Sequence, residues 1–598
     1  MPAPVRPSSS PAGLVEQWPW LIVAAAGLMA LADSTLWLSW HIIAALSGHG
    51  WSGPGWSIAL IVLVATRGTT AFTPSVPAAP LWVLTVVLTV STIAAIAAPA
   101  VVLIRRLLPS RDPARSMATR RDLHDLTPTA LTAKAIRLRP GLPTVRGEDL
   151  PAAQCGITLG RLKPSGPDLA ASWEDVLLAV MAPRSGKTTS LAVPTILNAP
   201  GWAVATSNKA DLWTTTAQLR AATGTVWTFD PQGIVHAEQT WWWNPISIVR
   251  NIATAHRLAS HFIQEIRSER GDKDFWSSAA QDLLTSLLLA AARADLDITA
   301  VDAWLNDTSN PEPVAILDDA QDHSAAASLR GRQQGAPDTR EGIYETARTA
   351  VQCLRDDTIM RWVTPQRGID TTFDVDAFVT STDTVYLLSK DGAGAAAPLV
   401  AALTDAIMRA AVQEAERAGG RLDPPGVIVL DEAANVCRIA DLPDLYSHLG
   451  SRGIIPLTVL QSYTQGKRVW GEIGMDTLWS AATIKVIGAG IDDARVAEDL
   501  SRLIGEEDVD VRSTSWGDGR YSRQASTRRQ RILDAADVRA LPRSTAILLS
   551  TGARAALISL LPWYTGPHRD AITAATTTAE AELTRRARTA HPRTGRPR

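Results

Sequence analysis

One apolar segment constrains this chain more than any other feature: residues 81–104, LWVLTVVLTVSTIAAIAAPAVVLI, run for 24 positions without a charge. A helix of about 20 apolar residues is long enough to cross a bilayer. Inside lipid, a segment must also satisfy its own backbone hydrogen bonds, as a helix does. The segment therefore predicts a transmembrane helix, with a buried helix of a soluble domain as the alternative.

A second apolar run, residues 21–46, predicts another transmembrane helix. It contains Asp33, which is costly in lipid unless it faces protein or lies near an interface. A signal peptide is the alternative, but the N-terminus is weakly basic and no small-residue cleavage pattern is present after it. Between the two spans, residues 58–65 are apolar but too short to cross, which favours a re-entrant or interfacial piece.

The charges that flank the spans predict their orientation. Arginines occur after the second span at positions 105, 106, 111, 115, 120 and 121, whereas residues 47–80 contain only Arg67 among lysines and arginines. Because basic loops stay inside, both termini and everything after residue 105 are expected to be cytoplasmic. The formal net charge of −2 means that any contact with nucleic acid must be local.

Beyond the spans, the sequence divides into four further regions. Residues 105–150 are rich in Arg, Pro and Thr and are interpreted as a juxtamembrane linker. Short apolar runs that alternate with helical patterns in 151–250 and 381–565 predict a parallel α/β sheet. Residues 251–380 are mainly helical in pattern and predict an inserted all-α domain. Residues 566–598 are interpreted as a disordered basic tail, and the three well-separated cysteines as buried thiols.

The stretch VMAPRSGKTTS, residues 180–190, resembles the phosphate-loop pattern G-x-x-x-x-G-K-[ST]. It comes after an apolar strand and opens a helix, although Met181 stands where the first glycine is expected. Phosphate would bind the backbone amides at the helix start. The expected ATP-binding residues are Arg184, Ser185, Gly186, Lys187, Thr188 and Thr189. Lys187 would neutralise the β- and γ-phosphate oxygens, and Thr188 would ligate Mg²⁺.

Two acids end a second apolar strand. In VIVLDEAA, Asp431 and Glu432 come after four apolar residues, so a buried strand would deliver both carboxylates to the edge of the sheet. Asp431 is expected to hold Mg²⁺, and Glu432 to orient or deprotonate the attacking water. The alternative is that these acids cap the next helix, but their order after the phosphate loop favours ATP hydrolysis.

Two further residues complete the predicted catalytic set. Gln461 ends the strand-like run PLTVLQS, where it could sense the γ-phosphate or the attacking water. Arg452 lies on the turn before that strand and could reach the nucleotide of a neighbouring subunit. A surface glutamine and a surface arginine are the respective alternatives.

Taken in order, these motifs resemble the TraG/TraD-type coupling proteins of conjugation and type IV secretion, within the FtsK-like translocase class. The resemblance rests on APRSGKTTSLAVPTIL, ATSNKADLW, DFWSSAAQDLLTSLLLAAA, VIVLDEAANV, LGSRGIIPLTVLQSYTQ and RILDAADVRALP, and covers residues 155–560. Two departures stand out: Met181 replaces a glycine, and no acid lies near Ser207 and Asn208, which leaves the role of Lys209 open.

The resemblance implies an α/β fold: a RecA-like P-loop NTPase domain with an inserted all-α domain and a two-helix transmembrane anchor in residues 1–104. It further implies a homo-hexameric ring beneath the bacterial inner membrane that uses ATP and Mg²⁺. The ring would move DNA, single-stranded and attached to a relaxase, or protein cargo towards a type IV secretion channel. Residues 512–531 are candidate pore contacts or, alternatively, a solvated loop or hairpin.

Two other functions remain open at this stage. One is a related ATPase: an FtsK-like pump for double-stranded DNA or a protein-secretion ATPase, although such pumps often have more spans or tandem ATPase domains. The other is a membrane receptor or adaptor that binds nucleotide without hydrolysing it. The presence of both Asp431 and Glu432 argues against the receptor.

Overall fold

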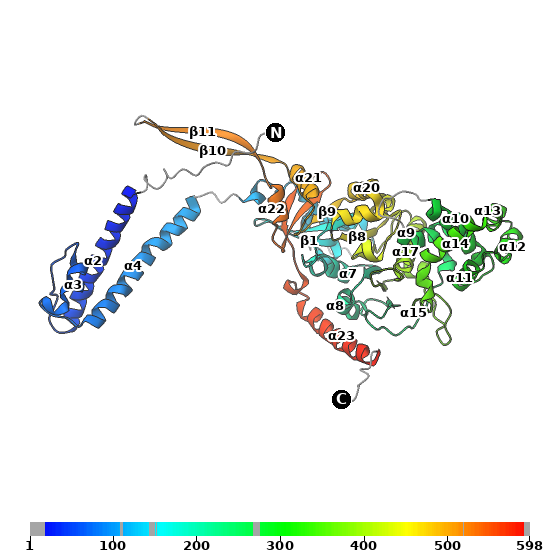
Figure 1. Ribbon diagram of the computed structural model, residues 1–598, viewed down its shortest axis with the longest axis horizontal. Helices are drawn as coiled ribbons and strands as arrows, with labels where there is room; N and C mark the ends of the chain where they lie inside the picture. Colours follow the sequence, from blue (N-terminus) through cyan, green and yellow to red (C-terminus); the bar gives the residue numbers. More distant parts are fainter. Residues whose placement is uncertain are drawn as a thin grey trace. The chain divides into compact units, whose positions relative to one another are not determined.

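The computed structural model describes residues 18–107, 112–142, 150, 152–266, 275–517 and 520–590. The chain separates into two compact units, an N-terminal unit of Met1–Arg111 and a C-terminal unit of Asp112–Arg598. Figure 1 shows the elements of both units along the chain.

Two long helices form the N-terminal unit: α2 (Trp18–Leu46) and α4 (Ala78–Leu107), joined through α3 (Leu60–Arg67) and the short η1 (Thr69–Ala71). The side-chain hydroxyls of Thr35 and Thr89 form a 2.7 Å hydrogen bond between α2 and α4. Within the described residues, Ala25–Leu46 and Ala78–Pro99 are long and apolar enough to cross a membrane.

Asp33 faces protein rather than the outside of this unit. It is fully buried, and its Oδ1 accepts a 2.7 Å hydrogen bond from the Ile61 amide of α3. Leu60 and Val64 of the same short helix are buried against α2 and α4. The apolar piece between the two spans therefore packs on the long helices and donates a backbone hydrogen bond to one oxygen of the acid that interrupts the first one.

The predicted linker, residues 105–150, is not an extended connection over its described part. Residues 105–107 belong to α4, and residues 112–142 contain η2 (Pro113–Arg115), η3 (His124–Leu126) and α5 (Pro128–Leu138). Leu123 and Leu126 are buried, and the Ala118 amide donates a 2.8 Å hydrogen bond to the Ala555 carbonyl. The apolar residues among the arginines thus pack this segment onto the sheet, and α6 (Ala152–Cys155) comes next.

An eleven-stranded sheet organises the C-terminal unit, in the order β2-β1-β13-β12-β9-β3-β8-β7-β4-β6-β5. The seven strands from β9 to β5 are parallel, and the other four join antiparallel at one side. The parallel strands are β3 (Leu177–Val180), β4 (Ala203–Ser207), β5 (Val226–Phe229), β6 (Thr384–Leu388), β7 (Gly426–Leu430), β8 (Ile454–Leu460) and β9 (Ile484–Ile487). The antiparallel strands are β1 (Gly156–Leu162), β2 (Asp168–Ser172), β12 (Thr545–Ser550) and β13 (Ala556–Ser559).

Both faces of this sheet are covered, which explains why its parallel strands are apolar throughout. In β3, Leu178 and Val180 belong to the core on one face, and Leu177 and Ala179 to the core on the other. The first core continues into α17 (Ala397–Arg417), α18 (Ala433–Val436), α19 (Leu442–Leu449), α20 (Tyr463–Ala481) and α21 (Ala494–Ile504). The second is covered by η4 (Thr188–Ala192), α7 (Val193–Leu197) and α8 (Asp211–Arg220).

The helical insertion lies between β5 and β6. After η5 (Pro245–Ile248), its larger helices are α9 (Ile252–Ile266), α10 (Phe275–Arg293), α11 (Ile298–Asn306), α12 (Glu312–Asp319), α13 (His323–Gln333) and α14 (Pro337–Ala350). The shorter η6 (Gln352–Arg355), α15 (Asp357–Met360) and α16 (Val375–Phe378) come after them. Helix α9 packs on α17 of the sheet domain and on α10, so the insertion shares the core of one sheet face (Figure 1).

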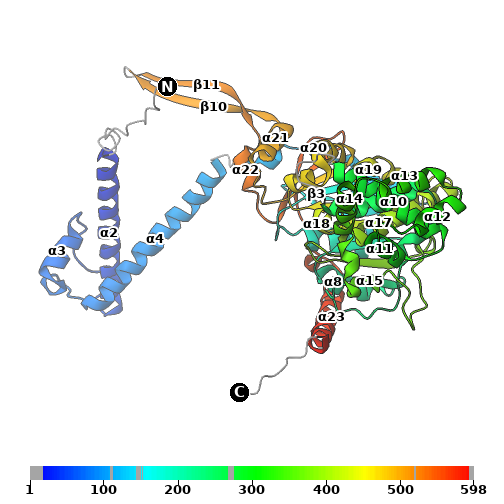
Figure 2. The same cartoon turned by 45° about the vertical axis from the view of Figure 1, so that its right-hand side comes forward.

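After β9 and α21 the chain forms a hairpin, β10 (Glu506–Gly517) and β11 (Arg520–Arg531), which is a two-stranded sheet of its own (Figure 2). Residues 512–531 are therefore the hairpin that the sequence left as an alternative. The chain then continues through the short α22 (Ala535–Arg539) to β12, and η7 (Gly450–Arg452) and η8 (Trp563–Thr565) are the remaining short helices described in this unit.

The prediction of a disordered tail is wrong for most of its length. Residues 569–590 form helix α23 (Arg569–Ala590), which packs against α8; residues 591–598 lie outside the described residues. Ile572 and Ala575 are buried, and Glu582 pairs with Arg585 and Arg586 within the helix. Alanine-rich composition and such pairs three and four residues apart favour a helix despite the basic charge.

Candidate nucleotide site

Three neighbouring parallel strands, β3, β8 and β7, end at one edge of the sheet and carry the predicted motifs. In register, Val180 of β3 lies opposite Leu460 of β8, and Leu430 of β7 lies opposite Thr458 of β8. The phosphate loop, Gln461 and the acids Asp431 and Glu432 therefore come directly after these strands, at the same edge. In open α/β sheets, ligands bind in the crevice at the carboxyl ends of the strands.

The phosphate loop turns back from β3 into η4, and two of its residues have left-handed backbone. Gly186 has φ +93°, a conformation in which only glycine is unstrained, and Arg184 has φ +63°. Ser185 is buried and donates a 2.6 Å hydrogen bond to the Ala182 carbonyl, whereas Arg184 is exposed at the crest of the loop. Thr188 and Thr189 are half-buried on the first turn of η4.

Met181, which replaces the expected first glycine, is accommodated by a glycine elsewhere. Its side chain is completely buried, and its amide donates a 2.9 Å hydrogen bond to the Leu460 carbonyl, which prolongs the β3–β8 pairing. At Gly488, just after β9, a Cβ atom would lie 2.6 Å from Met181 Cε and 2.8 Å from its Cγ. The room that Met181 needs is therefore provided by the absent side chain of Gly488.

We expect Gly488→Ala to destabilise the protein by about 1–3 kcal/mol, because the added methyl group overpacks the core beside the phosphate loop. Thermal unfolding of the full-length protein in detergent measures this as a lower Tm. Gly331→Ala in α13 is the matched control, since a Cβ there meets nothing within 4 Å. The double variant Met181→Ala/Gly488→Ala should recover much of the loss; a double variant no more stable than Gly488→Ala would contradict this packing.

The centre of the site is a buried cluster of one cation and two acids. The Lys187 ammonium contacts Glu432 Oε1 directly and lies 3.5 Å from Asp431 Oδ1. The side chains of all three residues are less than one tenth exposed. Two carboxylates for one ammonium leave an excess of negative charge in a region of low dielectric, where an additional cation is favoured.

Asp431 provides the test of whether a metal fits this cluster. Its Oδ1 is buried and accepts no hydrogen bond within the described residues. The pKa of Asp431 is raised to about 6, mainly by burial and also by the nearby Glu432 carboxylate, against the lowering effect of the Lys187 ammonium. A buried carboxylate oxygen without a hydrogen bond, together with the hydroxyl of Thr188 next to Lys187 in the sequence, offers the oxygen donors that Mg²⁺ prefers.

Glu432 is held at its position by a network of amides. It has left-handed backbone, φ 56° and ψ 40°, which costs a non-glycine residue about 1 kcal/mol or more and is typical of functional sites. Its Oε2 accepts hydrogen bonds from Gln461 Nε2 and, at 3.3 Å, from Asn435 Nδ2. Gln465 joins the two: its Nε2 donates to Asn435 Oδ1 at 2.7 Å, and its Oε1 accepts from the Gln461 amide at 3.1 Å.

Asn435 and Gln465 were missed by the sequence analysis, although a local signal points to both. Asn435 lies three residues after Glu432 on the first turn of α18, and Gln465 lies four residues after Gln461 on the first turn of α20. Polar side chains at these helical spacings from an identified site residue fall on the same side of the element. The structure thus brings together Lys187, Asp431, Glu432 and Gln461, with these two residues as supports.

Arg452 does not belong to this cluster. It ends η7, just before β8 begins at Ile454, whereas the nucleotide site lies beyond the other end of β8. Seven residues of strand at about 3.3 Å each separate the two edges by roughly 20 Å. In this chain, Arg452 donates a 3.2 Å hydrogen bond to the His448 carbonyl and lies 3.9 Å from Glu416. The action of Arg452 on the nucleotide of another subunit stays a prediction.

Lys209 lies nearer to the site edge, on the turn after β4. Its side chain is exposed, and its amide donates a 3.1 Å hydrogen bond to the Ser207 hydroxyl. The neighbouring Asn208 donates a 3.0 Å hydrogen bond to Asp391. None of these contacts links Lys209 to the buried cluster.

The chain is similar to known proteins over most of its C-terminal unit. The family model described as "Type IV secretory system Conjugative DNA transfer" matches residues 168–589. A curated relative, the conjugal transfer protein TraG of Escherichia coli, is 24% identical over 406 residues, which cover 62% of this chain and 62% of the relative. The chain thus spans less than two thirds of that relative's length.

Among solved structures, the bacterial conjugative coupling protein TrwBdeltaN70 in an unbound form has a TM-score of 0.49 and 17% identity, covering 67% of this chain and 89% of its own. The plasmid coupling protein TrwB in complex with ADP and Mg²⁺ has a TM-score of 0.47 and 17% identity, covering 68% and 89%.

Proposed function

The chain belongs to the type IV secretory system conjugative DNA transfer family, and on that premise we propose that it is a membrane-anchored, ATP-driven coupling protein. It binds DNA or protein cargo at the cytoplasmic side of the bacterial inner membrane and moves it into a type IV secretion channel. The observation that carries this proposal is the buried cluster of Lys187, Asp431, Glu432 and Gln461 at one sheet edge.

Each residue of the cluster has a distinct part in ATP hydrolysis. Lys187 leaves Glu432 and binds the β- and γ-phosphate oxygens, with the loop amides and Ser185 forming the cradle. Glu432, freed from the ammonium and still held by Asn435 and Gln461, accepts a proton from the attacking water. Thr188 and Asp431 would hold Mg²⁺, which neutralises charge on the phosphates when it is bound.

The pairing of Lys187 with Glu432 also restrains the catalytic base. While the ammonium is held by the carboxylate that must act as the base, Glu432 is unable to take a proton from water efficiently. Binding of the triphosphate competes for the ammonium and releases the base only when substrate is present. This exchange couples nucleotide binding to activation.

A ring of subunits, which we propose to be a homo-hexamer, explains the position of Arg452. Arg452 is separated from the nucleotide site of its own subunit by the length of β8, roughly 20 Å. It is therefore available to the nucleotide site of a neighbouring subunit. There it would stabilise charge in the transition state, as arginine fingers supplied by another subunit do. The two candidate membrane helices anchor this ring with the C-terminal unit in the cytoplasm.

The experiment that tests this function is cargo capture by Glu432→Gln protein in cells. We expect formaldehyde crosslinking to enrich DNA with the full-length variant, because the arrested motor retains nucleotide and holds its cargo. Digestion with a single-strand-specific nuclease should remove the captured DNA if it is single-stranded, and a covalently attached relaxase should be recovered with it.

The control is the double variant Lys187→Ala/Glu432→Gln, which lacks the phosphate-binding lysine. Captured DNA that resists the single-strand nuclease would instead indicate an FtsK-like pump for double-stranded DNA, and captured protein without DNA a protein-secretion ATPase. Recovery of neither cargo above the double variant would reject the proposed function.

A further inference from the structure

Two polar side chains lie next to each other at the C-terminal end of α9, the first long helix of the insertion. Gln264 is buried, and the Glu265 side chain is only 20% exposed. Buried polar groups in proteins have hydrogen-bond partners as a rule. Both residues find such partners outside the insertion, on segments of the sheet domain that come after β7 and β8.

Gln264 contacts α20 where that helix is interrupted. Its Nε2 donates a 2.7 Å hydrogen bond to the Val469 carbonyl. Two residues later, Gly471 has φ 73° and ψ 175°, which is not helical, so the first half of α20 ends there. Carbonyl groups in the last turn of a helix have no intrahelical partner. Gln264 therefore caps the first half of α20, which is the part that carries Gln465.

Glu265 contacts the segment after α18 through an arginine. Its Oε2 lies 3.4 Å from Arg438 Nη1, and the same guanidinium donates a 2.8 Å hydrogen bond from Nε to the Ala434 carbonyl of α18. Burial raises the pKa of Glu265, and the Arg438 guanidinium opposes that rise. Because burying an acid is unfavourable without a compensating partner, this pair links α9 to α18, the helix that carries Asn435.

The two helices that these residues contact are the ones that support the proposed catalytic base. Asn435 of α18 donates a hydrogen bond to Glu432 Oε2, and Gln465 of α20 donates a 2.7 Å hydrogen bond to Asn435 Oδ1. A further 2.7 Å hydrogen bond, from Trp470 Nε1 to the Ile439 carbonyl, joins the first half of α20 to the chain after α18. A shift of either helix would therefore move the amides that hold Glu432.

Apolar contacts already hold α9 on the sheet domain. Leu258, Phe262 and Ile263 are buried in the core that α9 shares with α17. Apolar burial is not directional, whereas hydrogen bonds prefer particular distances and angles. The polar pair at the end of α9 is thus not required to attach the insertion, but it restricts how α18 and α20 lie with respect to each other.

We propose that Gln264 and Glu265 are positioning residues for ATP hydrolysis: they fix α18 and α20 so that the amide network aligns Glu432 with the attacking water. The proposal rests on the proposed function, because it takes Glu432 as the general base. A misplacement of about 1 Å that is caused far from the chemistry can lower a rate about 10²-fold. Small shifts of these two helices are therefore sufficient for a large effect.

The test measures phosphate release from ATP by full-length protein in nanodiscs, with the variant Gln264→Met/Glu265→Met. Methionine is unbranched and favours helices, so it fills both positions without disturbing α9 but removes their hydrogen bonds. Thermal unfolding reports whether the variant is folded. If it is unfolded at the assay temperature, Glu265→Met alone, at the more exposed of the two positions, is tested with the same expectations.

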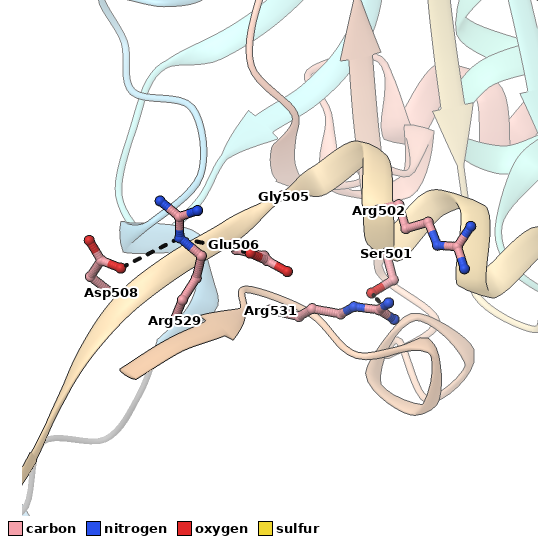
Figure 3. Close-up of a pocket in the computed structure, with 7 residues that line it drawn as sticks. All are labelled: Ser501, Arg502, Gly505, Glu506, Asp508, Arg529 and Arg531. Atoms are coloured by element: carbon pink, nitrogen blue, oxygen red, sulfur yellow. Dashed lines mark hydrogen bonds and ion pairs between the residues drawn. The ribbon is translucent and has the colours of Figure 1, made fainter. Parts of the chain in front are cut away.

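The matched control, Gln281→Met/Glu498→Met, makes the same two substitutions away from the amide network. Gln281 of α10 lies 3.1 Å from His256 of α9, and Glu498 of α21 forms an ion pair with Arg531 at the root of the β10–β11 hairpin. Figure 3 shows Arg531 extending from β11 towards α21. Because neither contact involves α18 or α20, the control should release phosphate at the wild-type rate.

We expect Gln264→Met/Glu265→Met to lower kcat about 10- to 100-fold and to leave KM for ATP within about 2-fold, since the phosphate loop is unchanged. Glu265→Gln should keep most of the rate, because its amide oxygen still accepts a hydrogen bond from Arg438. In a Glu432→Gln background, measured by single-turnover phosphate release, the two methionines should cause no further loss, because an effect that acts through the base disappears with the base.

A folded methionine variant with wild-type kcat would overturn the positioning role and leave the proposed function intact. An equal loss in the Glu432→Gln background would also overturn it, because it indicates a general structural defect. A higher KM with unchanged kcat would do the same, because it indicates a role in binding. A wild-type protein that does not hydrolyse ATP would overturn both the positioning role and the proposed function.

Discussion

Phosphate release from ATP is expected to fall at least about 100-fold when Lys187 is replaced by alanine, as for the loss of a preorganised charge donor at a developing anion. Lys187 is the only ammonium group in the described cluster at the sheet edge, and no other described basic side chain contacts Asp431 or Glu432. A fluorescent ATP analogue should also bind much more weakly, since the β- and γ-phosphates lose their counter-charge. Equal rates of phosphate release in the two proteins would remove the enzyme hypothesis.

Stability must be measured with activity in this variant. Without Lys187, the buried carboxylates of Asp431 and Glu432 lose their partner, and breaking a buried ion pair costs about 3–5 kcal/mol. Lys187→Ala should therefore unfold at a lower temperature than the wild type. Adding Glu432→Gln removes one of the two unpaired acids and should raise the Tm again, while phosphate release stays low. Recovery of Tm without recovery of activity separates the chemical role of the lysine from its structural one.

The same assay distinguishes the role of Arg452. Its side chain lies at the opposite edge from the phosphate loop, so Arg452→Ala should bind the ATP analogue like the wild type. If Arg452 acts on a neighbouring subunit, hydrolysis is lost only under conditions in which subunits assemble. An Arg452→Ala protein with wild-type hydrolysis in the assembled state would reject the finger.

The second large effect is expected for Glu432→Gln: hydrolysis should fall about 10²–10⁴-fold, the usual contribution of a general base. Nucleotide binding should be kept and even strengthened, because the Lys187 ammonium is no longer held by the Glu432 carboxylate and is more available to the phosphates. Single-turnover phosphate release and equilibrium binding of an ATP analogue measure the two effects separately.

Lys187→Ala and Glu432→Gln are expected to have opposite effects on nucleotide binding, so a comparison of the two variants separates binding from hydrolysis. Lys187→Ala should lose binding and hydrolysis together, whereas Glu432→Gln should lose hydrolysis alone. Gln461→Glu, which places a second acid against Glu432 Oε2, serves as a comparison for disruption of the amide network. If Glu432→Gln hydrolyses ATP at the wild-type rate, another group is the base and the assignment is wrong.

Much of the fold could be predicted because its signals are local. The strands at β3, β4, β5, β7, β8 and β9 are short apolar runs bounded by turn residues, and the long insertion has helical spacing of leucines and alanines. The same reasoning was wrong for residues 569–590, where clustered arginines suggested disorder. There, burial of Ile572 and the contact of α23 with α8 stabilise the helix that the alanine-rich composition favours.

The order of the motifs along the chain was sufficient to predict the catalytic residues of the candidate site. It did not predict the residues that hold them in place through hydrogen bonds. Lys187, Asp431, Glu432 and Gln461 each lie just after an apolar strand, and parallel strands bring the residues at their carboxyl ends to one edge. Asn435 and Gln465 lie on helices that begin after those strands, and their hydrogen bonds depend on how α18 and α20 pack side by side.

The amino-acid sequence by itself therefore determined the set of elements and the chemistry at their ends, because hydrophobic periodicity and turn residues act over a few neighbours. Only the tertiary structure decided how the groups share charge and space: that Lys187 is held by the base it must release, that Gly488 makes room for Met181, and that Arg452 lies at the far edge. These relations join residues up to about 300 positions apart, and they depend on strand order and packing.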